Sequence, residues 1–191
     1  MRDRVLEMAS ARALPWVQLR DHRVSPEVFA SCARDLVAQI RRLSPQTLVS
    51  VNGYPDLSAE LGVGLHLGFR SISPSGARSR LGPYTVIGYS AHSDSHLSVF
   101  ADCHYLTFSP VFLVAKATAS APIGLERLSY MTRLSNKPVF ALGAITVGRV
   151  KECLKAGAYG VAALSGVMSA PDSVASIKAY AEAIEDAMGG E

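Results

Sequence analysis

The sequence predicts an α/β fold built on a parallel sheet, of the (β/α)8 TIM-type barrel class. Short apolar and β-branched runs alternate along the chain with longer amphipathic segments, and polar or glycine residues recur where each run ends. Strands that are buried on both faces of a parallel sheet need such apolar runs. Barrels of this class carry their functional residues where the strands end. We expect a single domain over residues 1–191.

Seven segments have the composition of strands. In chain order they are Trp16–Arg20, Leu48–Asn52, Gly64–Leu67, Thr85–Ser90, Tyr105–Ser109, Val139–Gly143 and Gly160–Ser165. A helical pattern at Val5, Leu6, Ala9 and Ala13 precedes the first of them. Since a complete barrel has eight strands, either this barrel is incomplete or its first strand is missing from this version of the sequence. Such a sheet would leave two strand edges exposed.

Amphipathic helices are expected between these strands. The clearest covers residues 25–43, where Ser25 can cap the N-terminus and Pro26 occupies the first helical position. A second helix is expected to begin at Thr146 and to stop at Gly157, a residue suited to a left-handed C-terminal position. The last helix places one apolar stripe at Val174, Ile177, Ala181, Ile184 and Met188.

The composition excludes several classes of protein. Apolar residues make up 49% of the chain and charged residues 18%, which excludes a disordered chain and a nucleic-acid-binding tail. The formal charge of +3 suits an anionic ligand without requiring one. We find no apolar run of membrane-spanning length and no signal-peptide pattern. We therefore expect a cytoplasmic protein without nucleic-acid or membrane partners, and a homodimer as the default assembly.

The loops after the last two strands are the most informative part of the rim. Gly143 lies before a helix start at Thr146, and Ser165 and Gly166 precede another short turn. Barrels of this kind hold a phosphate with the backbone N–H groups of two such loops and the positive end of a helix. The alternative is that these glycines serve tight turns only. We expect a phosphate site here.

Gln18 and Arg20 alternate on the first strand and so face the same side of the sheet. An arginine facing a barrel interior needs an anionic partner, and its planar guanidinium matches phosphate oxygens. The alternative for Arg20 is a surface ion pair with Asp21 or another neighbour.

Three of the histidines lie near strand ends. His66 lies inside a strand between two leucines, which favours a hydrogen-bonded core histidine. His22 and His92 lie at loop starts and are better candidates for acid–base catalysis. No histidine pair has zinc-like spacing with a carboxylate, so we predict no structural metal. The cysteines are scattered and are expected to be buried free thiols, namely Cys32, Cys103 and Cys153.

Segments from about residue 5 to residue 185 resemble the thiamin phosphate synthase/TenI family. In chain order they are WVQLRDH, VNGYPDLSAELGVGLHLGF, ARSRLGPYTVIGYSAHS, YLTFSPVF, PIGLERL, KPVFALGAIT and GAYGVAALSGV. Each alone is a weak signal, but together they follow the family's order and spacing. The resemblance implies a barrel that binds a thiazole phosphate.

The resemblance also implies roles for particular residues. Synthases of the family join a pyrimidine diphosphate to a thiazole phosphate, and magnesium neutralises the leaving pyrophosphate. Residues similar to those that contact the pyrimidine diphosphate are Gln18, Arg20, Asn52, Ser90 and Lys116. Residues similar to those that hold the thiazole phosphate are Gly124, Gly143, Ser165 and Gly166.

Departures from the synthase pattern indicate a different reaction. Gly53 and Ser71 stand where synthases carry the two aspartates that hold magnesium, and neither can replace a carboxylate. His22 replaces a lysine, and Ala144 replaces one glycine of the phosphate loop. TenI proteins, which tautomerise a thiazole phosphate carboxylate without a metal, carry Asn-Gly as this chain does at Asn52 and Gly53.

We therefore expect an enzyme of thiamin biosynthesis, most similar to a metal-independent TenI-like thiazole tautomerase without a cofactor. The catalytic histidine of that branch precedes a Val-Phe pair, where this chain has Pro110. His92 and His22 are then the candidates for catalysis. The alternatives are a thiamin phosphate synthase with an altered magnesium site, and a non-catalytic binder or regulator that holds thiazole or thiamin phosphate.

Overall fold

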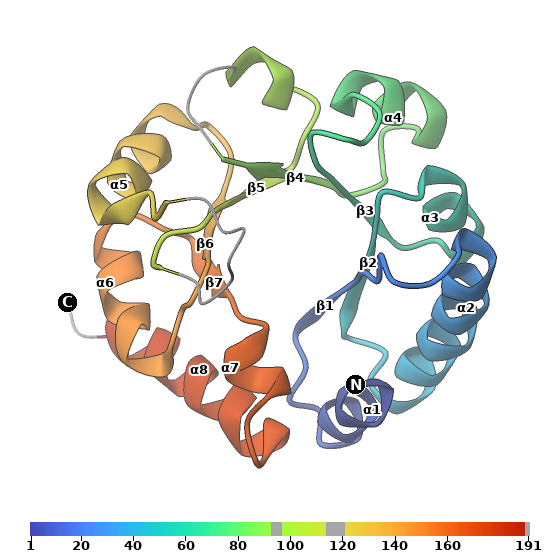
Figure 1. Cartoon of the computed structure of the whole chain (residues 1–191), viewed down its shortest axis with the longest axis horizontal. Coiled ribbons are helices and arrows are strands. Elements are labelled where there is room, and N and C mark those ends of the chain that lie inside the picture. The colour runs from blue at the N-terminus through green and yellow to red at the C-terminus, as the bar shows by residue number, and fades with distance from the viewer. Residues whose placement is uncertain (93–96, 114–120, 190–191) are drawn as a thin grey trace.

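The computed structural model describes residues 1–92, 97–113 and 121–189, in which strands and helices alternate (Figure 1). The strands are β1 Trp16–Leu19, β2 Leu48–Asn52, β3 Gly64–Leu67, β4 Ile87–Ala91, β5 Tyr105–Phe108, β6 Val139–Leu142 and β7 Gly160–Ala162. The α-helices are α1 Arg2–Ser10, α2 Pro26–Leu43, α3 Pro55–Leu61, α4 Pro74–Leu81, α5 Gly124–Leu134, α6 Val150–Lys155, α7 Ser165–Met168 and α8 Ser173–Met188. Two 3-10 turns cover Leu97–Phe100 and Val147–Arg149.

The strands form one parallel sheet in the order β1-β2-β3-β4-β5-β6-β7. This sheet curls around a central axis, and the helices cover its outer surface (Figure 1). Within the described ranges β1 and β7 are the two ends of the sheet and do not pair with each other, which leaves an open seam. The predicted barrel fold that lacks one strand is confirmed.

Each predicted strand is present, with small shifts at its ends. The largest difference is in the last strand, where β7 ends at Ala162 because the chain turns into α7 at Ser165. Several predicted site residues consequently lie just beyond their strands. Arg20, Ser109 and Gly143 directly follow β1, β5 and β6 at the carboxyl rim.

The helices follow their predicted signals with three differences, one of which is that Ala181 and Met188 of the apolar stripe predicted for the last helix are exposed. Ser25 caps α2 by accepting a hydrogen bond from the Val28 N–H at 3.4 Å, and Gly157 has the expected positive φ of 88°. The helix expected from Thr146 instead begins with a 3-10 turn, and α1 ends at Ser10, before the apolar Ala13. No helix in residues 1–92, 97–113 and 121–189 is long and apolar enough to span a membrane.

Two of the three cysteines are buried free thiols, as predicted. Burial raises the pKa of the Cys103 and Cys153 thiols to about 11. Cys32 is exposed, so the prediction is wrong for this residue. The reason is its position on α2, one residue off the buried stripe that contains Phe29 and Ala33.

Side chains alternate between the two faces of each strand. The outward-facing ones pack under the helices as the core, and those that are at most 1% exposed include Val51, Leu65, Leu67, Leu106 and Phe108. On the inner face, aromatic rings from opposite sides of the barrel meet. The Trp16 ring centroid lies 4.6 Å from that of Tyr105, which lies 5.7 Å from that of Phe140. This aromatic cluster fills the barrel where the strands begin.

Candidate functional site

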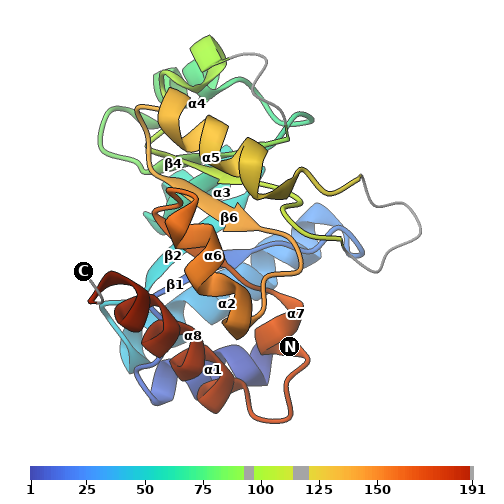
Figure 2. The same cartoon turned by 90° about the vertical axis from the view of Figure 1, so that its left-hand side faces the viewer.

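The loops after β6 and β7 lie side by side at the carboxyl end of the sheet, where α7 begins (Figure 2). Gly143 has a φ of 107° and Ala144 a φ of 48°, so the chain turns sharply after β6. A Cβ on Gly143 would lie 2.6 Å from the Cα of Pro110, so the β5–α5 connection can approach only a glycine. A Cβ on Gly166 would lie 3.4 Å from the Ile145 carbonyl oxygen. Gly143, Ser165 and Gly166 are therefore grouped, as their predicted common role requires.

Tyr180 of α8 supports both loops from behind. Its hydroxyl donates to the Ile145 carbonyl at 2.7 Å, and a Cβ on Gly166 would lie 2.1 Å from the same hydroxyl oxygen. Gly166 is thus required by the close approach of a buried tyrosine. Tyr180 could not be identified from the sequence, because the predicted apolar stripe runs through its neighbour Ala181, which is exposed in the structure, and no local signal shows which loop the ring reaches.

Replacing Tyr180 with phenylalanine is expected to lower the free energy of unfolding by about 1–2 kcal/mol, because the Ile145 carbonyl loses its buried donor. Urea denaturation would measure the change. Tyr84→Phe is the matched control, since the Tyr84 side chain is 96% exposed and should tolerate the same loss of a hydroxyl. Equal stability of the two variants would contradict the supporting role of Tyr180.

Arg149 ties the β6 loop to the neighbouring β5–α5 connection. It donates to the Ala144 carbonyl at 2.8 Å, and its guanidinium carbon lies 4.3 Å from the centroid of the Phe112 ring. Arg149 could not be identified from the sequence either, since an arginine on a short helical turn usually faces solvent. Its position indicates that the rim loops are held as one unit.

At the end of β1, Gln18 and Arg20 are both exposed beside the open seam. The Arg20 Nε donates to Nε2 of His22 at 2.7 Å, whereas Asp21 pairs with Arg23 at 2.9 Å. The pairing of Arg20 with Asp21, considered as an alternative, is therefore not formed. Because His22 Nε2 accepts from a guanidinium, the lone pair that a base would use is engaged. His22 is consequently the weaker candidate for acid–base catalysis.

His92 has a different arrangement directly after β4. Its Nδ1 lies 2.8 Å from the carbonyl oxygen of Ser109, and because a carbonyl can only accept, Nδ1 carries the proton. The basic nitrogen is then Nε2. Ser109 directly precedes Pro110, so the imidazole lies beside the end of β5. His92 is exposed at the rim, where a ligand can reach it.

The two positions of the lost aspartates are neighbours in space. A Cβ on Gly53 would lie 3.8 Å from the Ser71 hydroxyl oxygen, which itself accepts from the Gly68 N–H at 3.1 Å. The Gly53 N–H donates to the His66 carbonyl, and its φ of 79° favours glycine. Residues 1–92, 97–113 and 121–189 contain no cluster of three His, Cys, Asp or Glu side chains suited to a metal. One hydroxyl without a carboxylate does not fit magnesium, which prefers anionic oxygen ligands.

His66 is a hydrogen-bonded core histidine, as predicted. It is 1% exposed, and its ring nitrogens lie 2.9 Å from the Tyr105 hydroxyl and 2.8 Å from the Ser90 hydroxyl. Burial, helped by the positive charge of Arg20, lowers the pKa of His66 from 6.5 to about 4. The imidazole is therefore neutral at pH 7. Asn52 lies opposite His66 in the β2–β3 register, so the structure groups Asn52 and Ser90 around this histidine.

Of the two remaining predicted residues, the structure describes one. Lys116 lies outside the described residues. Gly124 begins α5 with a φ of 77°, and its N–H donates to the Val111 carbonyl at 3.1 Å. Its contact with a phosphate stays a prediction, and the engaged N–H favours a steric role over direct donation.

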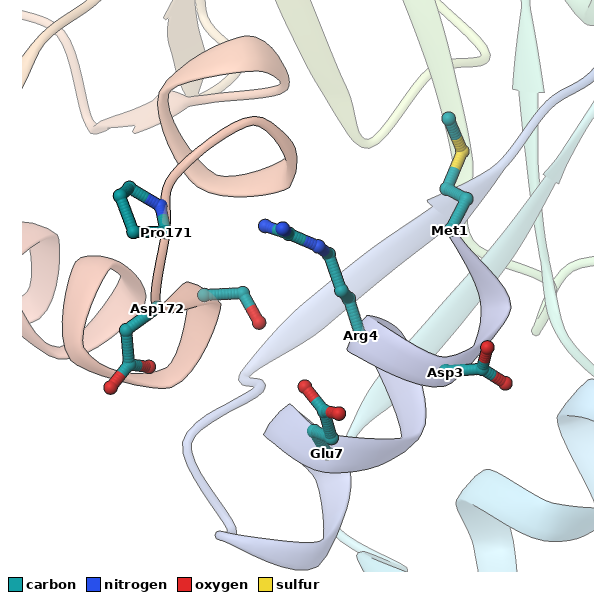
Figure 3. A pocket seen from close by; sticks show the side chains of 7 residues that line it. Met1, Asp3, Arg4, Glu7, Pro171 and Asp172 are labelled. Atoms are coloured by element: carbon teal, nitrogen blue, oxygen red, sulfur yellow. The ribbon is translucent and has the colours of Figure 1, made fainter.

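A pocket of about 600 Å³ lies away from these residues, between α1 and the segment that joins α7 to α8 (Figure 3). Its lining includes three carboxylates, those of Asp3, Glu7 and Asp172, and the guanidinium of Arg4, which donates to the Ala170 carbonyl. None of the predicted site residues lines it. A largely acidic wall does not suit a phosphorylated ligand, so we do not assign the site to this pocket.

The fold and the rim define a (β/α) barrel protein whose last two loops are held together at the carboxyl end of the sheet. The chain belongs to the thiamin phosphate synthase/TenI family, since the family model described as thiamine monophosphate synthase matches residues 2–167. This confirms the resemblance found in the sequence and places the chain in a family of thiamin-biosynthesis enzymes.

Individual relatives agree with this assignment. A putative thiamine-phosphate synthase of Geobacter sulfurreducens is 33% identical over 172 residues, covering 88% of this chain and 80% of the relative. A putative thiamine-phosphate synthase 2 of Aquifex aeolicus is 31% identical over 162 residues, covering 84% and 86%. The solved thiamine phosphate pyrophosphorylase from Pyrococcus furiosus has a TM-score of 0.83 at 25% identity and covers 96% of this chain and 91% of its own.

Proposed function

We propose that the chain is a TenI-like thiazole phosphate tautomerase, in which His92 transfers the proton and no metal takes part. The carrying observation is the hydrogen bond of 2.8 Å between His92 Nδ1 and the carbonyl oxygen of Ser109. It sets the imidazole beside Pro110, the position at which the resemblance to TenI proteins leads one to expect the catalytic histidine. A histidine from the neighbouring strand thus takes the place of the lost one.

A tautomerase moves one proton, so its site needs few catalytic groups. A neutral His92 can take a proton at Nε2 from one atom of the substrate and return it to another, which leaves atoms and charge unchanged overall. The proton on Nδ1 stays with the Ser109 carbonyl and fixes the tautomer and the direction of the ring. The loops at Gly143 and Ser165 would hold the thiazole phosphate through backbone N–H groups.

The remains of the magnesium site support this choice over a synthase. Gly53 and Ser71 are adjacent but supply no carboxylate, and the Ser71 hydroxyl already accepts a hydrogen bond from the Gly68 N–H. Departure of pyrophosphate develops several negative charges, which a synthase neutralises with a bound cation. These residues do not replace such a cation.

The second candidate function is thiamin phosphate synthase, because the relatives from Geobacter sulfurreducens and Aquifex aeolicus carry that name. It would join a pyrimidine diphosphate to a thiazole phosphate, with magnesium bound by other residues. The third candidate is a non-catalytic binder of thiazole or thiamin phosphate, which the loss of the usual histidine favours.

Calorimetric titration separates these functions. We expect thiazole phosphate to bind and pyrimidine diphosphate with magnesium to give no heat of binding. In an assay of tautomerisation, His92→Ala should lower the rate at least about 100-fold while the affinity for thiazole phosphate stays within about tenfold, because the phosphate loops are intact. Chelators should leave the rate unchanged.

Each other outcome selects another candidate. Binding of pyrimidine diphosphate with magnesium, followed by formation of thiamin phosphate, would make the chain a synthase. Binding of thiazole phosphate without turnover would make it a binder. Full tautomerase activity after replacement of both His92 and His22 by alanine would remove both proposed bases.

A further inference from the structure

A chain of hydrogen bonds crosses the barrel interior beneath the candidate site and ends at Ser90. We propose that His66 is a positioning residue which, held by Tyr105, commits the Ser90 hydroxyl to donate its proton to an anionic oxygen of the substrate. This inference rests on the proposed function, and it adds which substrate group lies above Ser90 and why.

The geometry leaves His66 only two choices. Its Nδ1 lies 2.9 Å from the Tyr105 hydroxyl and its Nε2 lies 2.8 Å from the Ser90 hydroxyl. A neutral imidazole donates through one nitrogen and accepts through the other. Whichever tautomer is present therefore fixes whether Ser90 receives a hydrogen bond from His66 or gives one to it.

The direction follows from the far end of the chain. Trp16 Nε1, which can only donate, lies 3.3 Å from the Ser50 hydroxyl. Ser50 also acts on Tyr105, opposing the rise in the Tyr105 pKa that burial causes. The Tyr105 hydroxyl is buried, so its proton needs an acceptor, and Nδ1 of His66 at 2.9 Å supplies one. The result is an Nε2–H that donates to Ser90.

Ser90 is left with a single option. Its oxygen accepts from His66 Nε2 and from the Thr107 hydroxyl, which lies 3.4 Å away. With both lone pairs engaged, the Ser90 oxygen can accept no further hydrogen bond, so Ser90 can contact a ligand only by donating its hydroxyl proton. The partner must be an acceptor, and the nearby positive charge of Arg20, which also acts on His66, favours an anionic one.

Packing holds this chain in place. A Cβ on Gly88 would lie 2.0 Å from the Cζ of Tyr105, so the glycine makes room for the tyrosine ring across β4. The same ring packs against Trp16 and Phe140 in the aromatic cluster. The buried chain is thus preorganised before a ligand arrives, as groups that orient a substrate need to be.

The first test does not depend on activity. In protein labelled with ¹⁵N-histidine, NMR should show His66 with a protonated Nε2 and an unprotonated Nδ1, unchanged between pH 7 and about pH 5.5, since its pKa is lowered to about 4. A proton on Nδ1 would reverse the direction of the chain and overturn the proposal. So would titration of His66 at its ordinary pKa of 6.5.

The second test uses a pair of amide variants. In His66→Gln the amide reaches the place of Nε2 and can still donate to Ser90, whereas in the shorter His66→Asn it lies at the place of Nδ1. For thiazole phosphate carboxylate we expect an affinity about tenfold lower in His66→Asn and in Ser90→Ala, and within about threefold of the parent in His66→Gln. Thiazole phosphate without the carboxylate should bind the parent and these three variants with similar affinity.

The ligand comparison identifies the anionic group and separates this inference from the proposed function. A loss confined to the carboxylate-bearing ligand supports the positioning role together with the tautomerase. A loss confined to pyrimidine diphosphate supports the positioning role but makes the chain a synthase. Equal affinities of His66→Asn, His66→Gln and the parent for both anionic ligands would overturn the role of His66, whatever the reaction.

Discussion

An alanine in place of Gly143 is expected to lower the free energy of unfolding by about 3 kcal/mol and to weaken binding of thiazole phosphate at least about tenfold. Two effects combine in Gly143→Ala. The φ of 107° is unfavourable for any residue with a Cβ, and that Cβ would lie 2.6 Å from a backbone atom of Pro110. Relief of the clash has to move the loop away from the β5–α5 connection, and the backbone donors move with it.

Gly148→Ala is the matched control for this prediction. Gly148 lies on the same β6–α6 connection, but a Cβ there would meet no atom within 4 Å. The control should keep both stability and affinity, because the added methyl enters open space. Urea denaturation and calorimetric titration of the two variants provide the comparison. Unchanged binding by Gly143→Ala would remove this loop from the phosphate site.

The fold could be predicted from the sequence because each strand carries its own signal. Short runs rich in apolar and β-branched residues, such as Leu48–Asn52, favour strands in a chain with helical segments on both sides, and the structure reproduces that strand at its predicted bounds. The end of the last strand could not be predicted. Ala163 and Leu164 are as apolar as β7 itself, and only the turn into α7 ends the strand.

The candidate site was partly predictable for a similar reason. Gly143 directly follows β6, and Ser165 lies three residues after the end of β7, so their grouping comes from the topology alone. Tyr180 and Tyr105 act across the fold, on loops and strands far away in the sequence. Their roles depend on which glycine, Gly166 or Gly88, leaves room for a ring, and a sequence does not show such pairings.

The buried neutral His66 should make the protein sensitive to mild acid. In the unfolded chain the histidine has its ordinary pKa of 6.5, whereas in the fold the pKa is lowered to about 4, mainly by burial and also by the charge of Arg20. Between pH 6.5 and about pH 4, this histidine is protonated in the unfolded chain but stays neutral in the folded protein. Stability contributed by this group is complete above that pH and is lost progressively toward pH 4. The free energy of unfolding should fall by about 2 kcal/mol between pH 7 and pH 5.

His66→Gln isolates this contribution, because glutamine keeps a donor toward Ser90 but does not titrate. Its unfolding free energy should change less than that of the parent between the two pH values, with the difference measured by urea denaturation at each. The pKa of His104 is also lowered, but this histidine is present in both proteins and cancels in the comparison. An equal loss of stability in both proteins would mean that His66 accepts a proton in the folded state. A protonated His66 would donate through both ring nitrogens. His66 would then not be a neutral imidazole, and it could not accept a hydrogen bond from Tyr105 as the proposed direction of the hydrogen-bond chain requires.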